Sequence, residues 1–139
     1  MLKDARPISV LLVDDDEDYY YLVKEAFQEA GVTEGLSWVK SGEELFQHLE
    51  TKRPRIILLD LNMPRMNGFE ALDRIKKNRQ LRRIPVVILT TSKSEADAVH
   101  SYDLGAASFI SKPIDFLLLV DWIRSFKKYW FEIAELPVT

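Results

Sequence analysis

The sequence lacks cysteine, and all of its apolar runs are short. Without cysteine the chain forms neither disulfides nor thiolate metal sites, and nothing in it opposes a reducing cytoplasm. The longest apolar runs, such as residues 116–120, fall far below the ~18 residues that a membrane span needs. The first residues show no signal peptide, because no long apolar stretch or small-residue cleavage site follows them. These absences predict a cytoplasmic protein with no membrane partner.

A strong excess of one charge is also missing. The formal net charge is −3, so the composition gives no general reason to expect nucleic acid as a partner. The basic stretch 76–83 lies at the end of a predicted helix, where positive charge is favourable in any case, and we interpret it as a solvated surface. A length of 139 residues suits one domain with a full core. We therefore expect a single domain over residues 1–139, with short disordered tails at both ends.

Five short apolar runs punctuate the sequence. They lie at residues 8–13, 36–39, 56–59, 86–89 and 109–110. Most of them are rich in Val, Ile and Leu without polar alternation, which is typical of strands buried on both faces of a parallel sheet.

Helix signals lie between and after these runs. An apolar stripe at residues 22–30 ends at Gly31, and Ser41 with Glu44 forms a capping-box pattern that opens the next helix. Further helices are predicted over 68–78, over 94–104 with Gly105 as the stop, and from Pro113 to about residue 134. Strand and helix thus alternate five times, which predicts an open α/β sheet with helices on both faces.

Polar side chains gather where the predicted strands end. Asp14 and Asp15 follow the first strand, and Asp60 follows the third. Thr90 ends the fourth strand, and Lys112 comes just after the fifth. Parallel strands end at one edge of a sheet, and neighbours lie ~4.8 Å apart, so these side chains can meet in one pocket. Each alone has an ordinary structural explanation, such as capping a helix or forming a turn, but their combination at four strand ends predicts a site.

The acidic residues of this pocket predict a divalent cation. Three carboxylates cannot share a small space unaided, because like charges disfavour joint ionisation. An all-oxygen set of ligands suits Mg²⁺. A carboxylate held against Mg²⁺ can attack a phosphoryl group and form an aspartyl phosphate. The Lys112 ammonium and the Thr90 hydroxyl would then bind the phosphoryl oxygens.

The motifs around these residues resemble those of the CheY-like response regulator receiver domain. The matching segments are 10–15, 58–68, 88–91 and 105–113. The first three end at Asp15, Gly68 and Thr91, and the last begins at Gly105. They occur in the order of the family and span nearly the whole chain. The resemblance implies a flavodoxin-like, doubly wound (βα)5 fold, whose five-stranded parallel sheet has the order 2-1-3-4-5 and carries helices on both faces.

The resemblance also implies a role for each residue of the pocket. Asp60 would be the phosphoacceptor, and Lys112 would pair with the phosphoryl oxygens. Mg²⁺ would be bound by Asp15 directly, by Asp14 mostly through water, by Asp60, and by the backbone carbonyl of Asn62. The chain would take its phosphoryl group from a sensor histidine kinase. It would assist its own phosphorylation and autodephosphorylation without being an independent enzyme.

Further positions match the switch of the family. Thr90 would be drawn toward the phosphoryl group, and Phe109 would turn inward behind it. The Lys112–Pro113 peptide bond would be cis, and Gly68 would free the loop that follows the acceptor. Nothing in the core set of residues is missing, which argues against a degenerate receiver.

Signalling output is expected at the surface of the fourth helix, the fifth strand and the fifth helix. The sequence ends soon after the fifth helix, so we expect no effector domain and an output made by protein contact. The last helix is apolar around much of its circumference. We expect Trp122 and Phe126, together with Tyr102 and Phe109, to form a homodimer interface. The alternative is that the extra apolar residues fold back against the domain.

Within the family, the sequence is most similar to the phytochrome-linked single-domain regulators. The acidic run 14–18, the connection 81–85 and the aromatic tail 129–137 carry this similarity. It implies a phytochrome-type kinase as the phosphodonor.

Three other functions fit parts of the pattern. A phosphatase of the haloacid dehalogenase type also uses a strand-end aspartate, but it needs a second one two residues on, where this chain has Asn62. A flavin or nucleotide binder needs a glycine-rich phosphate loop after the first strand, where this chain has acidic residues. A constitutive docking module would never turn over phosphate, and a phosphorylation assay distinguishes it from a receiver.

Overall fold

A computed structural model describes residues 8–137, in which five parallel strands form one sheet in the order β2-β1-β3-β4-β5. The order and the shared direction confirm the predicted flavodoxin-like fold. The tails expected at the two ends lie outside the described residues, apart from position 137. The elements are β1 (Val10–Val13), α1 (Glu17–Glu29), β2 (Leu36–Val39), α2 (Gly42–Thr51), β3 (Ile56–Leu59), α3 (Gly68–Lys77), β4 (Val86–Thr90), α4 (Glu95–Asp103), β5 (Ser108–Ser111), α5 (Phe116–Lys128) and η2 (Tyr129–Ile133).

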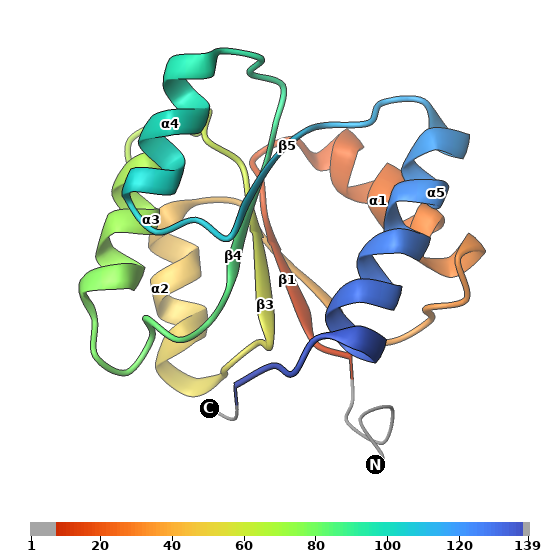
Figure 1. The fold of residues 1–139 in the computed structure, drawn as a ribbon, viewed down its shortest axis with the longest axis horizontal. Coiled ribbons are helices and arrows are strands. Elements are labelled where there is room, and N and C mark those ends of the chain that lie inside the picture. The colour runs from red at the N-terminus through yellow and green to blue at the C-terminus, as the bar shows by residue number, and fades with distance from the viewer. Residues whose placement is uncertain (1–7, 138–139) are drawn as a thin grey trace.

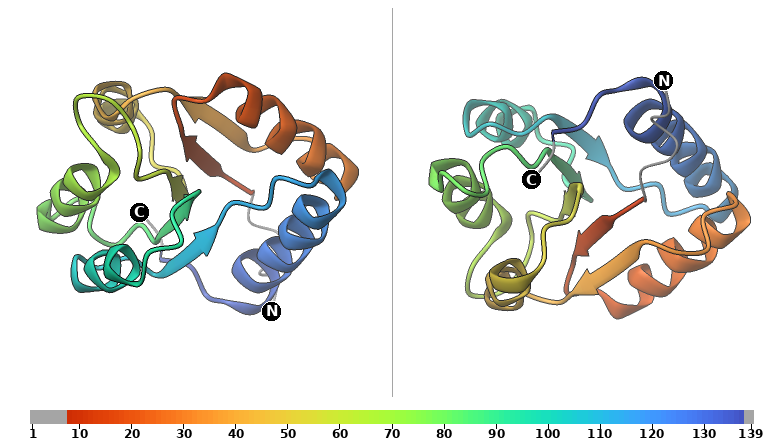
Figure 2. Two further views of the ribbon diagram at one scale, coloured as in Figure 1. Left: turned by 90° about the horizontal axis from the view of Figure 1, so that it is seen from above. Right: turned by 90° about the horizontal axis from the view of Figure 1, so that it is seen from below.

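Helices cover both faces of the sheet. Figure 1 and Figure 2 show α2, α3 and α4 on one face and α1 and α5 on the other. Each face has its own apolar core: Leu11 and Val13 pack with α2 and α3, whereas Val10 and Leu12 pack with α1 and α5. Successive residues of a strand point to opposite faces, so a run without polar alternation fills both cores.

The predicted strands agree with the observed ones to within two residues. β2 and β3 have the expected bounds, β1 begins two residues later, and β4 and β5 are slightly longer. β1, β3 and β4 are fully buried, whereas the edge strands β2 and β5 are partly exposed because each has a neighbour on one side only. The three central strands, whose ends carry the predicted aspartates and Thr90, are therefore covered on both faces.

The helix ends follow local signals, with one correction. Gly31 and Gly105 come shortly after α1 and α4 with φ angles of 86° and 106°, the left-handed conformation that glycine adopts most readily. Ser41 caps α2 by accepting from the Glu44 N–H, but the Glu44 carboxylate accepts from the Lys40 N–H and not from that of Ser41. The predicted capping box is therefore only half formed.

A complete capping box opens α3 instead. The Asn67 side chain accepts from the Glu70 N–H, and the Glu70 carboxylate accepts from the Asn67 N–H. Asparagine serves this role as well as serine does, so a search for the serine and threonine pattern alone passes over it.

The last helix is shorter than predicted. α5 ends at Lys128, and the chain continues as η2, a turn of π-helix in which the Ala134 N–H donates to the Tyr129 carbonyl at 2.7 Å. No helix among residues 8–137 is long and apolar enough to cross a membrane.

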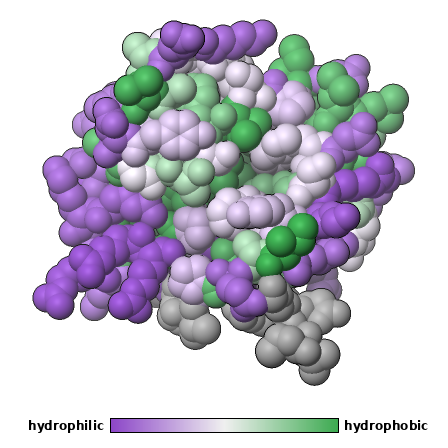
Figure 3. All heavy atoms as spheres, in the orientation of Figure 1, coloured by the Kyte–Doolittle hydropathy of each residue, from purple (hydrophilic) through white to green (hydrophobic). Residues whose placement is uncertain are grey.

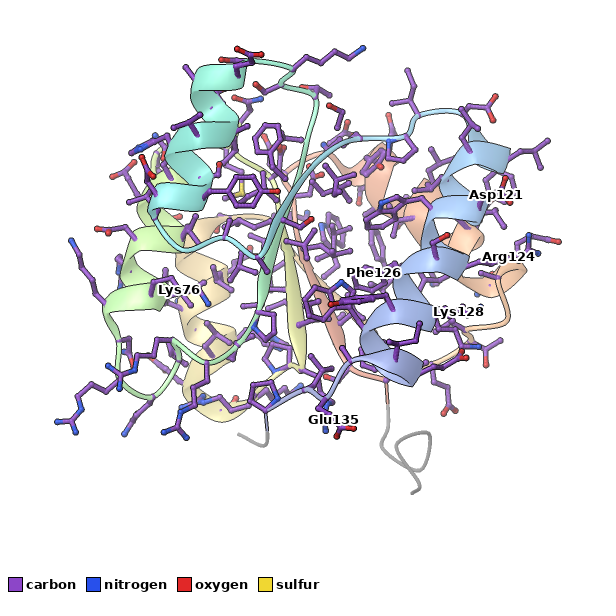
Figure 4. All side chains as sticks on the ribbon, in the orientation of Figure 1. Lys76, Asp121, Arg124, Phe126, Lys128 and Glu135 are labelled. Atoms are coloured by element: carbon purple, nitrogen blue, oxygen red, sulfur yellow. The ribbon has the colours of Figure 1, made fainter. Side chains whose placement is uncertain are left out.

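The aromatic side chains of α5 pack mostly inward. Phe126 is 6% exposed and belongs to the core shared with α1, and Trp122 stacks on it with ring centroids 5.2 Å apart. Figure 4 shows Phe126 on the sheet side of α5, whereas Asp121 and Arg124 point away from the sheet. The expectation that Phe126 lies on a free dimer surface is wrong, because packing within the chain already covers its ring. The alternative, folding back against the domain, holds for this residue.

Other apolar side chains remain exposed at the start of α5. Leu117 and Leu118 are 71% and 62% exposed, and Ile114, just before the helix, is 75% exposed. Figure 3 shows hydrophobic side chains at the upper right, where α5 begins, and hydrophilic ones over the lower left. The free apolar surface of α5 thus lies near its first turn and not at its aromatic residues.

Lys76 departs from the solvated interpretation of the basic stretch. Its ammonium donates to the carbonyls of Arg82 at 2.9 Å and Ile84 at 2.7 Å, and burial lowers its pKa. Figure 4 places Lys76 between α3 and the chain that leads to β4. The other basic side chains of residues 76–83 are exposed, as expected.

Candidate functional site

The ends of the central strands bring the predicted acidic residues together. β1 pairs with β3 in a register that sets Val13 beside Leu59, so Asp14 and Asp60, the next residues, are neighbours. The Asp60 N–H donates to the Val13 carbonyl at 3.0 Å, and the Asp14 N–H donates to the Val39 carbonyl of β2 at 3.1 Å. These ladder bonds fix both backbones at the carboxyl edge of the sheet.

Three carboxylates converge at this edge. Asp14, Asp15 and Asp60 each offer an oxygen that lies within 4.8 Å of the other two. Asp14 is fully buried and Asp60 is nearly so, whereas Asp15 is exposed. The cluster therefore has a buried floor and one side that solvent, an ion or a small phosphodonor can reach.

The Lys112 ammonium reaches the carboxylates from the loop after β5. The Lys112 N–H donates to the Thr90 carbonyl at 2.8 Å, which holds the loop against β4. Its Nζ lies 2.7 Å from Oδ2 of Asp14 and 3.4 Å from Oδ2 of Asp60. Burial lowers the pKa of Lys112, but the attraction of Asp14 and then of Asp60 outweighs burial and raises the pKa above its ordinary value. Lys112 is therefore the fixed cation of the site.

One ammonium does not balance three carboxylates, which leaves a formal charge of −2. Burial raises the pKa of Asp14, and the Lys112 cation offsets this only in part. Oδ2 of Asp14 is buried and contacts Lys112 as an ion pair, but it accepts no hydrogen bond of normal geometry from the described residues. A buried carboxylate oxygen in this state, within an all-oxygen set, fits a divalent cation such as Mg²⁺.

Thr90 and Asn62 line the same site with neutral groups. Thr90 is buried at the end of β4, and its Oγ1 accepts from the Asn62 side-chain amide and from the Ser92 N–H, both at 3.4 Å. The Asn62 N–H donates to Oδ1 of Asp60, also at 3.4 Å. These contacts, which the Thr90 oxygen accepts, are long for hydrogen bonds, so the hydroxyl can leave them at little cost and donate its own proton to a stronger acceptor.

Gly68 packs against the backbone of Asp60, and its role is not the expected one of freeing the loop. A Cβ at Gly68 would lie 2.3 Å from the Asp60 carbonyl oxygen, so only glycine fits between α3 and the acceptor. Its φ is not positive, whereas Arg65 in the same loop has a φ of 65°. Close approach, and not freedom of the loop, therefore requires this glycine.

Tyr19 also belongs to the site, although no pattern in the sequence indicates it. Tyr19 is buried in α1, the Lys112 Nζ lies 4.5 Å from its ring centroid, and its hydroxyl donates to the Pro113 carbonyl at 3.1 Å. Burial and then the charges of Asp14 and Asp60 raise the pKa of Tyr19 well above its usual value, so the hydroxyl stays protonated. In the sequence this residue is one more member of an apolar helical face.

Trp38 is a second contact that the sequence did not reveal. Its indole Nε1 donates to the backbone carbonyl of Asp14 at 2.8 Å, and its ring stacks on Tyr20 at a centroid distance of 4.2 Å. The edge strand β2 thus steadies the residue that bears the buried carboxylate.

The expected cis bond before Pro113 is absent. The Lys112–Pro113 bond is trans, like every peptide bond among residues 8–137. The trans form is favoured by ~0.5–1 kcal/mol for a bond to proline. In this loop the Lys112 N–H and the Pro113 carbonyl already have partners in Thr90 and Tyr19.

Polar contacts lead from the site to α4 and β5. Ser92 Oγ donates to Oδ2 of Asp97 at 2.6 Å, and the Phe109 N–H donates to the Tyr102 hydroxyl at 3.2 Å. Phe109 is half-buried against the core of its face, and Tyr102 is exposed. Ser101 is the one buried residue of α4.

The comparisons with known proteins agree with this geometry. Residues 10–124 match the response regulator receiver domain. Response regulator Rcp1 of Synechocystis sp. is 33% identical over 138 residues, 94% of either chain, and the structure of its Mn²⁺-bound form gives a TM-score of 0.84 over 95% of this chain and 100% of that one.

Two further relatives have similar identity. The phosphorylated cyanobacterial phytochrome response regulator RcpA is 34% identical, with a TM-score of 0.88 over 96% of this chain and 100% of that one. The probable methanogenesis regulatory protein FilR2 of Methanothrix harundinacea is 35% identical over 136 residues, 94% of this chain and 88% of FilR2.

Proposed function

This chain belongs to the response regulator receiver domain family, and from that premise we propose that it is a single-domain regulator that accepts a phosphoryl group on Asp60. The observation that carries the proposal is the convergence of Asp14, Asp15 and Asp60 with Lys112 at one edge of the sheet. In this role the chain is a regulatory phosphoacceptor and not an independent enzyme.

We assign Mg²⁺ binding to the side chains of Asp14, Asp15 and Asp60 and to the backbone carbonyl of Asn62. The formal charge of −2 supports this assignment, as does the buried Oδ2 of Asp14, which contacts the Lys112 ammonium but accepts no hydrogen bond of normal geometry from the described residues. The Mn²⁺-bound form of Rcp1 supports it further, since Mn²⁺ and Mg²⁺ favour the same oxygen ligands. When bound, the cation neutralises charge on the carboxylates and on the phosphoryl oxygens.

The proposed reaction is transfer from a phosphohistidine of a sensor kinase. An oxygen of Asp60 attacks the phosphorus, the new oxygen–phosphorus bond forms as the nitrogen–phosphorus bond breaks, and the electron pair leaves with the imidazole. Lys112 pairs with one phosphoryl oxygen, and the Thr90 hydroxyl donates to another. Water later hydrolyses the acyl phosphate, which returns the Asp60 carboxylate and inorganic phosphate.

Thr90 and Phe109 are the proposed switch. The two 3.4 Å contacts to the Thr90 hydroxyl leave it free to turn toward a phosphoryl oxygen. Phe109 is half-buried and can turn further inward once the hydroxyl has moved. This change would alter the surface of α4, β5 and α5, through which the protein signals by contact.

We further propose that this surface binds a second copy of the chain. With Phe126 buried, the exposed Tyr102, Leu117 and Leu118 would form the contact, and the half-buried Trp122 would lie at its rim. Sedimentation with and without beryllofluoride tests this, and a monomer under both conditions would exclude the dimer.

The proposed phosphodonor is a sensor histidine kinase of the phytochrome type. Similarity to the cyanobacterial phytochrome response regulator RcpA supports this choice. FilR2 is as similar, so a panel that contains phytochrome-type and other histidine kinases decides the partner. Preferential labelling by a kinase of another type would overturn this part of the proposal.

Labelling at Asp60 tests the whole proposal. Wild type with Mg²⁺ should take up phosphate from acetyl phosphate, and Asp60→Asn or EDTA should abolish uptake. Asp73→Asn is the matched control, because Asp73 is a carboxylate of α3 whose ion-pair partner among residues 8–137 is the exposed Lys77. Mass spectrometry that places the label on another residue would refute the assignment. A wild type that no donor labels would instead favour a docking module.

A further inference from the structure

We propose that Tyr19 is the positioning residue of the Lys112 ammonium during phosphoryl acceptance, a role that rests on the function proposed above. The inference comes from two contacts that one side chain makes with one loop. The ring faces the Lys112 Nζ at 4.5 Å, and the hydroxyl donates to the carbonyl of the next residue, Pro113, at 3.1 Å.

The ring contact lies well within the range of a cation–π interaction. Such contacts extend to ~6 Å from the ring centroid, and they strengthen when both groups are desolvated. Here the Lys112 side chain is 5% exposed and Tyr19 is 6% exposed, so water screens the contact little. The ring therefore covers one side of the ammonium while the carboxylates attract it from another.

The position of this ammonium matters because its partners compete. Nζ is closer to Asp14, at 2.7 Å, than to the acceptor Asp60, at 3.4 Å. Once a cation occupies the carboxylates and a phosphoryl group arrives, Lys112 must turn to a new partner on a flexible four-carbon stem. An aromatic face attracts the ammonium without a charge or a carboxylate that competes with the phosphoryl oxygens. Tyr19 thus keeps Nζ within reach before and after the exchange.

The hydroxyl contact fixes the loop that carries Lys112. The Lys112 N–H is held by Thr90 of β4, and the carbonyl of Pro113 is held by Tyr19 of α1. α1 is itself anchored in the core by Val23 and other buried residues. Through Tyr19, α1 therefore contacts both the side chain of Lys112 and the loop that carries it.

Two variants of Tyr19 separate the ring from the hydroxyl. Tyr19→Leu removes both contacts, Tyr19→Phe removes only the hydroxyl, and Tyr21→Leu makes the same change at an exposed tyrosine of α1. The measurements are the maximal rate and half-saturation of Asp60 labelling by acetyl phosphate, the affinity for beryllofluoride, and the affinity for Mg²⁺ by calorimetry.

We expect Tyr19→Leu to lower the maximal labelling rate and the beryllofluoride affinity by roughly three- to tenfold. Its Mg²⁺ affinity should stay near that of wild type, because the carboxylates are untouched. Tyr19→Phe should recover most of the loss, and Tyr21→Leu should behave like wild type. A Tyr19→Leu protein that labels like wild type, a Tyr19→Phe protein as impaired as Tyr19→Leu, or an equal loss of Mg²⁺ affinity would each overturn the proposal.

An NMR signature of wild type tests the contact without any dependence on folding of the variants. The ring current of Tyr19 should shift the Lys112 Hε resonances upfield, and Tyr19→Phe should retain the shift. Unshifted Hε resonances would overturn the proposal even if Tyr19→Leu fails to fold. If wild type shows the shift but no donor labels Asp60, the contact stands and the proposed function is what has failed.

Discussion

The two helices that flank β5 are attached to the molecule in opposite ways. α5 buries Leu119, Val120, Ile123 and Phe126 in the core shared with α1, whereas α4 buries Ser101 alone. α4 contacts its neighbours through groups such as Asp97, which accepts the 2.6 Å bond from Ser92, and His100, whose ring lies 4.6 Å from that of Phe69. The apolar density of α5, which suggested a partner surface, mainly anchors that helix to its own domain. A polar helix next to the site is the one that can shift.

The functional residues divide along the same line. Asp14 and Lys112 lie on loops joined to the anchored side, where Tyr19 contacts both the side chain and the loop of Lys112. Thr90 and Ser92 lead into α4 through a long hydrogen bond of 3.4 Å between them and a short one of 2.6 Å from Ser92 to Asp97. Asp14 and Lys112 are thus firmly held, and the groups proposed to respond are on the side that is easier to move.

The largest effect should come from removing a core side chain of α5. We expect Phe126→Ala to lower the free energy of unfolding by about 3–5 kcal/mol, because its buried ring leaves a cavity next to α1. Val99→Ala on α4 should change it by less than about 0.5 kcal/mol, since Val99 is 60% exposed. Urea denaturation measures both. Equal losses would remove the contrast between the two helices.

The next effect tests how much the metal-free site works against folding. Burial raises the folded-state pKa of Asp14 above 3.8, so its ionised form costs stability at neutral pH. Asp14→Asn should raise metal-free stability by about 1–2 kcal/mol, because Lys112 keeps Asp60 as its partner. The gain should disappear as the pH falls through the folded-state pKa toward 3.8, because protonated Asp14 of wild type is then neutral, as the asparagine of the variant is.

Mg²⁺ provides the control for that prediction. Wild type should gain stability from added Mg²⁺, and Asp14→Asn should gain less, since a ligand stabilises only as far as it binds the folded state. A variant that is less stable than wild type without metal would show that the Asp14–Lys112 pair is a net contributor.

A smaller effect should distinguish the helices by mobility. Asp97→Ala removes the acceptor of the Ser92 hydroxyl, at a cost of about 1 kcal/mol. Amide hydrogen exchange should then accelerate in α4 and remain unchanged in α5. In Asp97→Asn, which keeps an oxygen in place, the exchange rate of the α4 amides should lie between those of wild type and Asp97→Ala. Acceleration in both helices would mean that α4 and α5 open together.

The smallest effect concerns the link from α4 to β5. Tyr102→Phe removes the hydroxyl that accepts from the Phe109 N–H, and because Tyr102 is exposed we expect a loss of only about 0.5 kcal/mol. The Phe109 amide should exchange faster, while the amides of α5 should not. An unchanged Phe109 amide would show that β5 is held by its strand pairing alone.

Much of this molecule could be predicted from its sequence. The buried strands stand out as unbroken apolar runs, because a strand covered on both faces tolerates no polar alternation. The site could be placed because parallel strands end at one edge of a sheet, and because the resemblance to the receiver family implied the strand order that brings Asp14, Asp60 and Lys112 together there. Direction and order of the strands therefore carried the prediction from elements to site.

The rest depends on contacts between distant segments, which leave no local pattern. Tyr19 and Pro113 are far apart in the sequence, and nothing near either residue indicates their bond. Whether Phe126 faces a partner or the core depends on how α5 rotates against α1, which an almost uniformly apolar helix does not specify. Trp38 reads as an ordinary strand residue until β2 is seen beside Asp14.

The fit of Gly68 against Asp60 has a mechanical consequence. Even a methyl group would not fit between the acceptor carbonyl and α3, so the backbone of Asp60 is in close contact with Gly68 and cannot move further toward α3. When a phosphoryl group is added to the carboxylate, the Asp60 backbone therefore cannot make room for it by moving toward α3. We therefore expect any movement to occur on the side of Thr90 and Ser92, where the contacts of the Thr90 hydroxyl are 3.4 Å long. The close contact at Gly68 thus determines the direction in which the groups around Asp60 can be displaced.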